Sequence, residues 1–286
     1  MVRFGVAGHP LAFFESPFGK DGMKIFEWLH GLGLNAFEAQ MTYGPKTSIE
    51  DCKKIKKLSE ELDIKVSVHG AYYIVLASDD KVKVRRSIET LKKTFKLADL
   101  MGADTVVIHP GSLYGEDPKI IMDKLEKNIG LFFDEIGDSH IGLFLETAGK
   151  KGQIGSVEEI LYLSDNIKGC FPCIDFGHVH AREGGSLRSP ESIDKLFDVL
   201  KKHKMFSKNN RIHFHYTPIH YGNRGEIVHK KIDDIDNKGN LYHPRYERIV
   251  ENIAKLKIPV TIISETHNSQ EQGAMAMRDV YKRVVT

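Results

Sequence analysis

The sequence has little of three features that would place it in a special class of protein. It has only three cysteines in 286 residues, an odd number far below the density of a secreted disulfide framework. No apolar run approaches the roughly 20 residues that cross a membrane, and the N-terminal run is too short for a signal peptide. Lysine and arginine (41) barely exceed aspartate and glutamate (39), so bulk charge neither demands nor excludes a nucleic-acid partner. We therefore expect a cytoplasmic protein with no membrane partner.

What the sequence does contain is enough apolar material for a large core, and many histidines. Hydrophobic residues make up 41% of the chain, and no change of composition marks a linker between domains. The 14 histidines matter because imidazole is the commonest neutral metal ligand. Cys170 and Cys173 have redox-motif spacing, but they lie inside an apolar run with no second pair, so we interpret them as core residues.

Short apolar runs alternate with amphipathic segments along the whole chain. The runs predict strands at residues 2–7, 36–40, 64–68, 105–108, 141–145, 170–174, 211–216 and 259–263. The segments between and after them predict helices at residues 23–32, 47–62, 81–101, 118–136, 156–163, 190–203, 244–256 and 270–285. Eight rounds of strand then helix, with short turns, predict an α/β fold in which residues 1–286 form a single (β/α)8 TIM barrel domain. The lysine-rich stretches at 53–57, 81–86 and 201–204 are then expected to be solvated outer helix faces.

Histidine or a carboxylate follows the third to the eighth predicted strand. These side chains are His69, His109, Glu146, Asp175, the pair His213 and His215, and Glu265. In a closed parallel barrel the carboxyl ends of the strands meet at one rim, so these residues are expected to converge. Any one of them alone would be an ordinary hydrogen-bonded rim residue. As a set, they are all residue types that bind metals.

Mixed histidine and carboxylate ligands suit Zn²⁺, and Mn²⁺ or Fe²⁺ are also compatible. A set of this size suggests more than one ion, because clustered carboxylates repel one another unless cations compensate them. Two ions ~3.5–4 Å apart assist attack at phosphorus, whereas a lone ion on such a rim polarises a sugar carbonyl. The pattern by itself predicts a multi-metal barrel enzyme and leaves these two chemistries open.

Six motifs resemble those of one family over essentially the whole chain. They are SVHGAYY (67–73), VIHPGS (107–112), LETAGKKGQIGS (145–156), CIDFGHVHAR (173–182), HFHYTPIHYGNRGEIVH (213–229) and SETHN (264–268). The chain resembles the endonuclease IV family of apurinic/apyrimidinic endonucleases, within the xylose-isomerase-like TIM barrel superfamily, and its shorter archaeal-type members in particular. The resemblance implies a monomeric zinc-dependent phosphodiesterase that cleaves double-stranded DNA 5′ to abasic sites in base excision repair.

The resemblance also implies two to three zinc ions and a set of ligands. Carried over by motif, the catalytic residue is Glu146, and the metal ligands are His69, His109, Glu146, Asp175, His178, His215, His229 and Glu265. For the seventh strand we favour His215 over His213, although both alternate onto the same face. Tyr72 matches a position that contacts DNA in the family, and an ordinary amphipathic rim tyrosine explains it nearly as well.

Two departures from the family pattern bear on this interpretation. The family has an aspartate two residues before the histidine that matches His229, and this chain has Ile227 there, with Glu226 as the nearest carboxylate. The family's basic DNA-penetrating residue also has no counterpart in residues 41–44. The first departure concerns the third metal site and the second concerns the contact with DNA.

Two other functions fit the same pattern. One is a sugar or keto-acid isomerase or epimerase of the xylose-isomerase-like barrels, which would not need His69, His109 and His229 as additional ligands. The other is a catalytically silent DNA-binding or metal-binding relative, which the two departures motivate.

Overall fold

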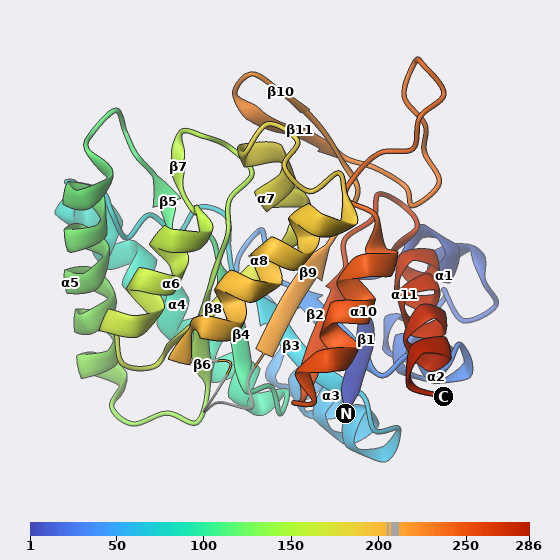
Figure 1. The fold of residues 1–286 in the computed structure, drawn as a ribbon. Coiled ribbons are helices and arrows are strands. Elements are labelled where there is room, and N and C mark those ends of the chain that lie inside the picture. The colour runs from blue at the N-terminus through green and yellow to red at the C-terminus, as the bar shows by residue number, and fades with distance from the viewer. Residues whose placement is uncertain (205, 207–211) are drawn as a thin grey trace.

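The computed structural model describes residues 1–204, 206 and 212–286, and it confirms the predicted (β/α)8 barrel as a single domain. Eight parallel strands close into a barrel in the order β1, β12, β9, β8, β6, β4, β3, β2 (Figure 1). Their bounds are β1 Val2–Ala7, β2 Ala36–Gln40, β3 Lys65–His69, β4 Thr105–Ile108, β6 Gly142–Glu146, β8 Cys170–Asp175, β9 Ile212–Tyr216 and β12 Val260–Ser264. The predicted start of the seventh strand, Arg211, lies outside the described residues.

Helices surround this barrel and pack their apolar faces against it (Figure 1). Their bounds are α1 Leu11–Glu15, α2 Ile25–Gly31, α3 Ile49–Glu61, α4 Lys81–Leu100, α5 Pro118–Ile136, α6 Val157–Asn166, α7 Phe176–Arg182, α8 Pro190–Lys202, α10 Tyr246–Leu256 and α11 Gln270–Val285. Side chains that cap the first turn fix several helix starts, as where Ser156 and Glu159 form a reciprocal capping box at α6. In the described part of the chain, every helix falls short of the length or apolarity that a membrane crossing needs.

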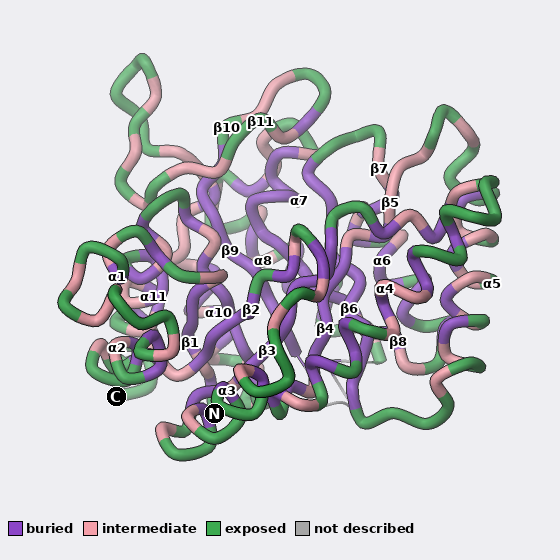
Figure 2. The backbone as a smooth tube through the Cα atoms, turned by 180° about the vertical axis from the view of Figure 1, so that it is seen from behind, coloured by how far each residue is buried: buried purple, intermediate pink, exposed green. Residues whose placement is uncertain are grey.

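The core has two layers. Most buried apolar side chains lie between the strands and the surrounding helices, and the strands themselves are buried along nearly their whole length (Figure 2). A smaller cluster of Val107, Phe144 and Cys173 fills part of the space inside the barrel. All three cysteines are free and buried, as expected for core residues. The barrel interior is therefore a packed support for the rim, and no channel is needed to explain it.

Several short elements were not predicted, and they lie on the carboxyl side of the barrel strands. Residues 176–182 fall between the predicted elements, and they form α7, which begins where β8 ends. The polar segment after β9 contains a hairpin of β10 (Ile219–Gly222) and β11 (Gly225–His229), and it lies above the barrel in Figure 1. A third addition pairs β5 (Gly111–Ser112) with β7 (Gln153–Ile154). A 3-10 turn, η1 (Gly22–Lys24), also precedes α2.

Candidate metal centre

The structure brings the eight expected metal ligands together at the carboxyl rim of the barrel. Together with Glu226 they form three groups, and within each group the ligand atoms lie within 4.8 Å of one another. The groups are His69, His109 and Glu146; Glu146, Asp175, His215 and Glu265; and His178, Glu226 and His229. The convergence follows from the parallel topology, because β3, β6, β8 and β9 all point toward this rim.

Glu146 lies at the centre of the site, and its side chain is buried. One carboxylate oxygen, Oε2, lies 3.1 Å from His69 Nε2 and 3.4 Å from His109 Nε2. The other oxygen, Oε1, lies 3.2 Å from both His178 Nδ1 and His215 Nδ1. Burial acts to raise the pKa of Glu146, but the surrounding histidines outweigh it and hold this pKa well below its usual value. The residue is therefore an anion that faces two ligand groups at once.

The first group presents nitrogen lone pairs to Glu146. His69 Nδ1 donates to the carbonyl of Gly70 at 3.0 Å, so in the neutral ring Nε2 carries the lone pair that faces the carboxylate. Burial lowers the pKa of His109 to about 4, which keeps this ring neutral. For His69, burial acts in the same direction, but the hydrogen bond and charge of Glu146 raise the pKa to about 9. A lone pair and a carboxylate repel each other, so this pair requires a proton or a metal cation between them.

Three carboxylates share the second group with His215. His215 Nδ1 lies 3.2 Å from Glu146 and 3.4 Å from Glu265 Oε1. Asp175 is buried; its Oδ1 accepts the backbone N–H of His178 at 2.7 Å, while Oδ2 has no hydrogen-bond partner in the described part of the chain. Burial, together with the charges of Glu146 and Asp175, raises the pKa of Glu265. A buried carboxylate oxygen without a donor, beside other carboxylates, fits a cation site.

The third group gives the clearest evidence about what it binds. His178 Nδ1 donates to Thr147 O at 2.9 Å, and His229 Nδ1 donates to Glu265 O at 3.2 Å. Each neutral ring thereby uses its N–H, so the two Nε2 atoms, 3.3 Å apart, need a proton or a cation between them. Burial acts to lower the pKa of His178, but the charges of Asp175, Glu146 and Glu226 raise it well above its usual value, which reflects the same demand for positive charge. Glu226 lies 3.6 Å from both Nε2 atoms. Two lone pairs and a carboxylate converge on one point, which is the arrangement that a divalent cation satisfies.

In the third group, Glu226 supplies the carboxylate that the aspartate at the position of Ile227 supplies in the family pattern. Ile227 is 58% exposed on β11, whereas the preceding Glu226 reaches the third group. Space for it exists because Gly149 has no side chain: a Cβ there would lie 2.7 Å from Glu226 Cβ and 3.2 Å from His178 Cδ2. The hairpin register shifts between His220 and Tyr221, opposite this segment. Neither the glycine contact nor the shift could be read from the sequence.

The two histidines of β9 take different places: His215 belongs to the second group at the rim, and His213 belongs to none of the three groups. His213 lies deeper in the barrel, and its Nε2 donates to Glu38 Oε2 at 2.9 Å. His215 Nε2 lies 3.2 Å from both oxygens of Glu38, so Nε2 carries the proton and the lone pair on Nδ1 is left for the rim. Cys173 lies close enough to the two histidines to make a further group of ligand types in the barrel interior.

Glu38 is the residue that sequence reasoning missed. It is fully buried, and it also accepts from Ser67 Oγ at 3.0 Å. Burial acts to raise its pKa, but the charges and hydrogen bonds of His215 and His213 hold the pKa well below its usual value. The sequence did contain a sign of its role, because Glu38 stands between Phe37 and Ala39 in a run that predicts a strand. A charge buried in a strand is costly unless partners compensate it, so a glutamate there indicates such partners.

Two exposed tyrosines lie close together in the neighbouring loops. Tyr72 is 66% exposed and lies edge-on to Tyr43, with ring centroids 5.8 Å apart; Tyr43 itself is 75% exposed. Residues 41–44 contain no basic residue, and the first one in the loop that carries Tyr43 is Lys46, which is exposed. Tyr72 is thus free to contact a large partner at the rim.

Comparison with known proteins agrees with the fold and extends the likeness to named nucleases. A family model described as a xylose isomerase-like TIM barrel matches residues 26–283. An uncharacterized protein of Methanocaldococcus jannaschii is 27% identical over 97% of this chain and 96% of its own. A probable endonuclease 4 of Halothermothrix orenii is also 27% identical, over 68% of this chain and 72% of its own.

Solved structures match over nearly the whole chain. An endonuclease IV from Thermus thermophilus has a TM-score of 0.69 at 19% identity and covers 99% of both chains. A D-tagatose 3-epimerase-like protein has a TM-score of 0.68 at 18% identity and covers 99% of this chain and 98% of its own. At these identities the two matches establish the shared fold and do not choose between nuclease and epimerase chemistry.

Proposed function

The chain belongs to the xylose isomerase-like TIM barrel family, and we propose that within it the protein is a metal-dependent apurinic/apyrimidinic endonuclease. Its substrate would be double-stranded DNA, and the bond cleaved would be the phosphodiester 5′ to an abasic site. The observation that carries the proposal is the sharing of Glu146 between two ligand groups, with the third group adjoining. Several cations held side by side suit phosphoryl chemistry better than carbonyl chemistry. The relatives named probable endonuclease 4 support the same choice.

The chemistry of the ligands favours Zn²⁺ over other metals. Imidazole nitrogens mixed with carboxylates suit Zn²⁺, and Mn²⁺ or Fe²⁺ are compatible with the same set. Bound cations would supply positive charge that polarises the phosphate and stabilises the attacking and leaving oxygens. We assign the three described groups to two or three such ions, with Glu146 facing two of them.

The protein's own residues would hold these charges in place and shield them from water. Glu146, Asp175 and His215 are all completely buried, so their positions are fixed by packing. Backbone carbonyls orient the rings of His69 and His178, and Glu38 orients His215. Such fixed geometry makes electrostatic stabilisation effective, because no reorganisation is needed during the reaction.

An isomerase or epimerase is the second candidate, because an epimerase-like structure matches the fold with a comparable TM-score. A one-metal or two-metal sugar enzyme would need only the second group, with its three carboxylates and His215. It would not need two lone pairs facing each other between His178 and His229. The third group therefore favours the nuclease.

The proposal is tested with a DNA duplex that holds one abasic analogue, incubated with the purified protein with and without a chelator. We expect a nick 5′ to the analogue that the chelator abolishes and added Zn²⁺ or Mn²⁺ restores. Glu146→Gln should reduce the rate at least ~100-fold while the fold is kept. The matched control is Glu158→Gln on the exposed face of α6, which should cleave like the unaltered protein.

Three outcomes would contradict the proposal. A protein that binds a single ion and leaves the duplex intact would favour the epimerase, and turnover of a ketose would then identify it. A protein that binds several ions and the duplex, but does not cleave, would be a silent relative. Full activity in Glu146→Gln would mean that the centre has been misplaced.

A further inference from the structure

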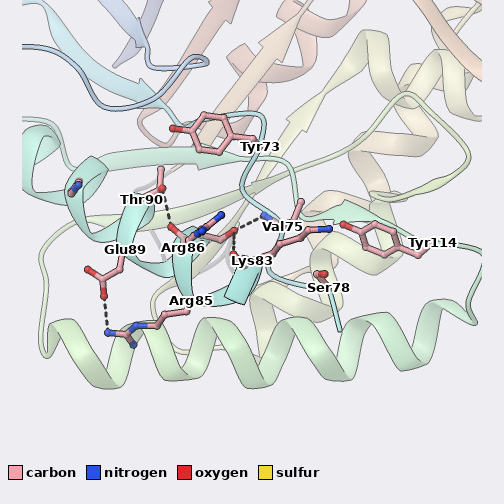
Figure 3. A pocket seen from close by; sticks show the side chains of 11 residues that line it. Tyr73, Val75, Ser78, Lys83, Arg85, Arg86, Glu89, Thr90 and Tyr114 are labelled. Atoms are coloured by element: carbon pink, nitrogen blue, oxygen red, sulfur yellow. Dashed lines mark hydrogen bonds and ion pairs between the residues drawn. The ribbon is translucent and has the colours of Figure 1, made fainter. Parts of the chain in front are cut away.

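A groove on the outer side of the barrel begins at the loop that carries Tyr72 and Tyr73. It has a volume of about 750 Å³ and lies along the first three turns of α4. Figure 3 shows it from close by, with Lys83 and Arg86 drawn below Tyr73, and Tyr114 to their right. Helices of a β/α barrel begin at the carboxyl ends of the strands, so the start of α4 lies beside the rim. Residues 81–86 were expected to be a solvated face, and all of them but Val84 are exposed; Lys83, Arg85 and Arg86 also line this groove.

The cations of the groove are arranged in one line. Lys83, Arg86 and Lys93, with Thr90 between the last two, follow helical spacing and form one face of α4. Among the residues that the structure describes, none places a carboxylate within ion-pair distance of Arg86 or Lys93. Lys83 Nζ lies 3.8 Å from Asp80 Oδ2, and its side chain is 64% exposed.

The acidic residue of the groove is neutralised by its neighbours. Glu89 accepts from Arg85 at 2.6 Å, and Lys92 lies 3.4 Å from it. Arg85 and Lys92 also pair with Glu135 of α5, so this ionic cluster is satisfied internally. What remains for a partner is the line of three cations, and its complement is a chain of negative charges.

Aromatic rings connect the groove to the rim. Tyr73 is 45% exposed and Tyr114 is 52% exposed, and both line the groove. Tyr72 lies edge-on between Tyr73 and Tyr43, with centroid distances of 5.8 Å to each. The three tyrosines 43, 72 and 73 thus form a continuous row from the neighbouring rim loop to the groove.

We propose that this groove binds a single-stranded stretch of nucleic acid that leaves the rim. Aromatic faces that stack on bases, combined with cations that follow a phosphate backbone, are the two elements of sequence-tolerant single-strand binding. The line from Lys83 to Lys93 spans about 15 Å of helix, which matches about four nucleotides at most, if their bases stay stacked at the ~3.4 Å rise of duplex DNA. An acidic peptide would satisfy the cations but would leave the exposed rings of Tyr73 and Tyr114 without stacking partners. The proposal rests on the proposed function only for its choice of nucleic acid.

The test measures binding of a fluorescein-labelled dT oligonucleotide of 15 residues by anisotropy, in chelator, at several salt concentrations. We expect the double variant Arg86→Gln/Lys93→Gln to bind at least ~10-fold more weakly near 0.1 M salt. We also expect it to lower the slope of log affinity against log salt by about 1.4, since each phosphate contact on a single strand contributes about 0.7. Tyr114→Ala should weaken binding about fivefold or more with an unchanged salt slope, because it removes stacking and no charge.

The matched control is Lys96→Gln, which removes an exposed charge from the same helix outside the groove. It should bind the oligonucleotide like the unaltered protein. Equal losses in Lys96→Gln and in the double variant would overturn the proposal, because binding would then depend on net charge alone. Poly-glutamate competing as well as dT at equal charge would also overturn it.

The result is separable from the proposed function. A protein that binds dT through this groove but nicks no abasic duplex would refute the endonuclease proposal and support the groove as a single-strand site. If the protein nicks the duplex, but neither the double variant nor Tyr114→Ala changes its affinity for dT, only the proposal for the groove is refuted.

Discussion

Replacing Glu38 by glutamine tests whether the rim depends on the buried interior of the barrel. Glu38 Oε2 accepts from Ser67 and His213, and His215 Nε2 lies 3.2 Å from both carboxylate oxygens. The amide of the Glu38→Gln variant would keep one oxygen and place N–H donors in the position of the other. One of these donors would face the N–H of His215, which is a repulsive contact in a buried site.

The geometry leaves His215 two responses to this contact, and both weaken the second ligand group. The ring can shift its proton from Nε2 to Nδ1, which removes the lone pair that faces Glu146 and Glu265 at 3.2 and 3.4 Å. Alternatively the ring can rotate, so that Nδ1 no longer faces Glu146 and Glu265. Loss of a carboxylate that orients a metal-bound histidine costs about 10- to 100-fold in metal affinity or activity. Loss of a charged buried hydrogen bond costs about 1.5–3 kcal/mol of unfolding free energy.

The assay is competition for Zn²⁺ against a chromophoric chelator, paired with thermal unfolding in excess chelator. We expect Glu38→Gln to lower the affinity of one ion by about 10- to 100-fold and to lower the melting temperature. The control is Ser67→Ala, which removes one donor to the same carboxylate but leaves its charge and its contacts with both histidines. Unchanged zinc affinity in Glu38→Gln would refute the reasoning, whatever happens to the melting temperature.

Two further predictions use other contacts. Gly149→Ala should displace Glu226 and so lower the metal content by the ion of the third group, while the other groups keep theirs. The control is Gly152→Ala, where a Cβ meets nothing within 4 Å, and its metal content should equal that of the unaltered protein. Equal metal content in the two variants would contradict this prediction. Asp194→Asn should lower the unfolding free energy by about 1 kcal/mol at pH 7, because it breaks the two-pronged pair of Asp194 with Arg248 between α8 and α10. The pKa of Asp194 is lowered to about 2 by Arg248, so this stabilisation is present above the unfolded pKa near 4 and is lost as pH falls toward 2. Denaturant melts of both proteins should therefore converge between about pH 4 and pH 2, and a gap that stays constant would exclude the pair as its cause.

The barrel and most of the rim could be predicted because both depend on local sequence pattern. A run such as residues 141–145 is apolar on every side chain, as a strand covered on both faces must be, and a polar residue after it marks the strand end. Once eight such runs alternate with amphipathic helices, topology alone places Glu146 and Asp175 at one rim. No knowledge of a distant contact is needed for this step.

The rest depends on contacts between segments that pattern does not connect. Glu226 reaches the third group only because Gly149, far along the chain, leaves room for it. Glu38 is stabilised only because β9 presents His213 and His215 to it across the barrel. The groove along α4 was missed because a charged helix face and a loop tyrosine look solvated until the two are brought together.

The difference between what was predicted and what was missed also bears on function. The first two ligand groups come from the barrel strands and the residues that directly follow them, and structures of both nuclease and epimerase type share the barrel fold. The third group comes from α7 and from β11 of the added hairpin. A shared barrel therefore says little about the reaction. The pair His178 and His229 says more, because their Nε2 atoms face each other at 3.3 Å. If variants that replace only His178 and His229 lose activity on abasic DNA, the specificity depends on α7 and the hairpin. If they keep this activity, the specificity depends on the residues of the barrel strands.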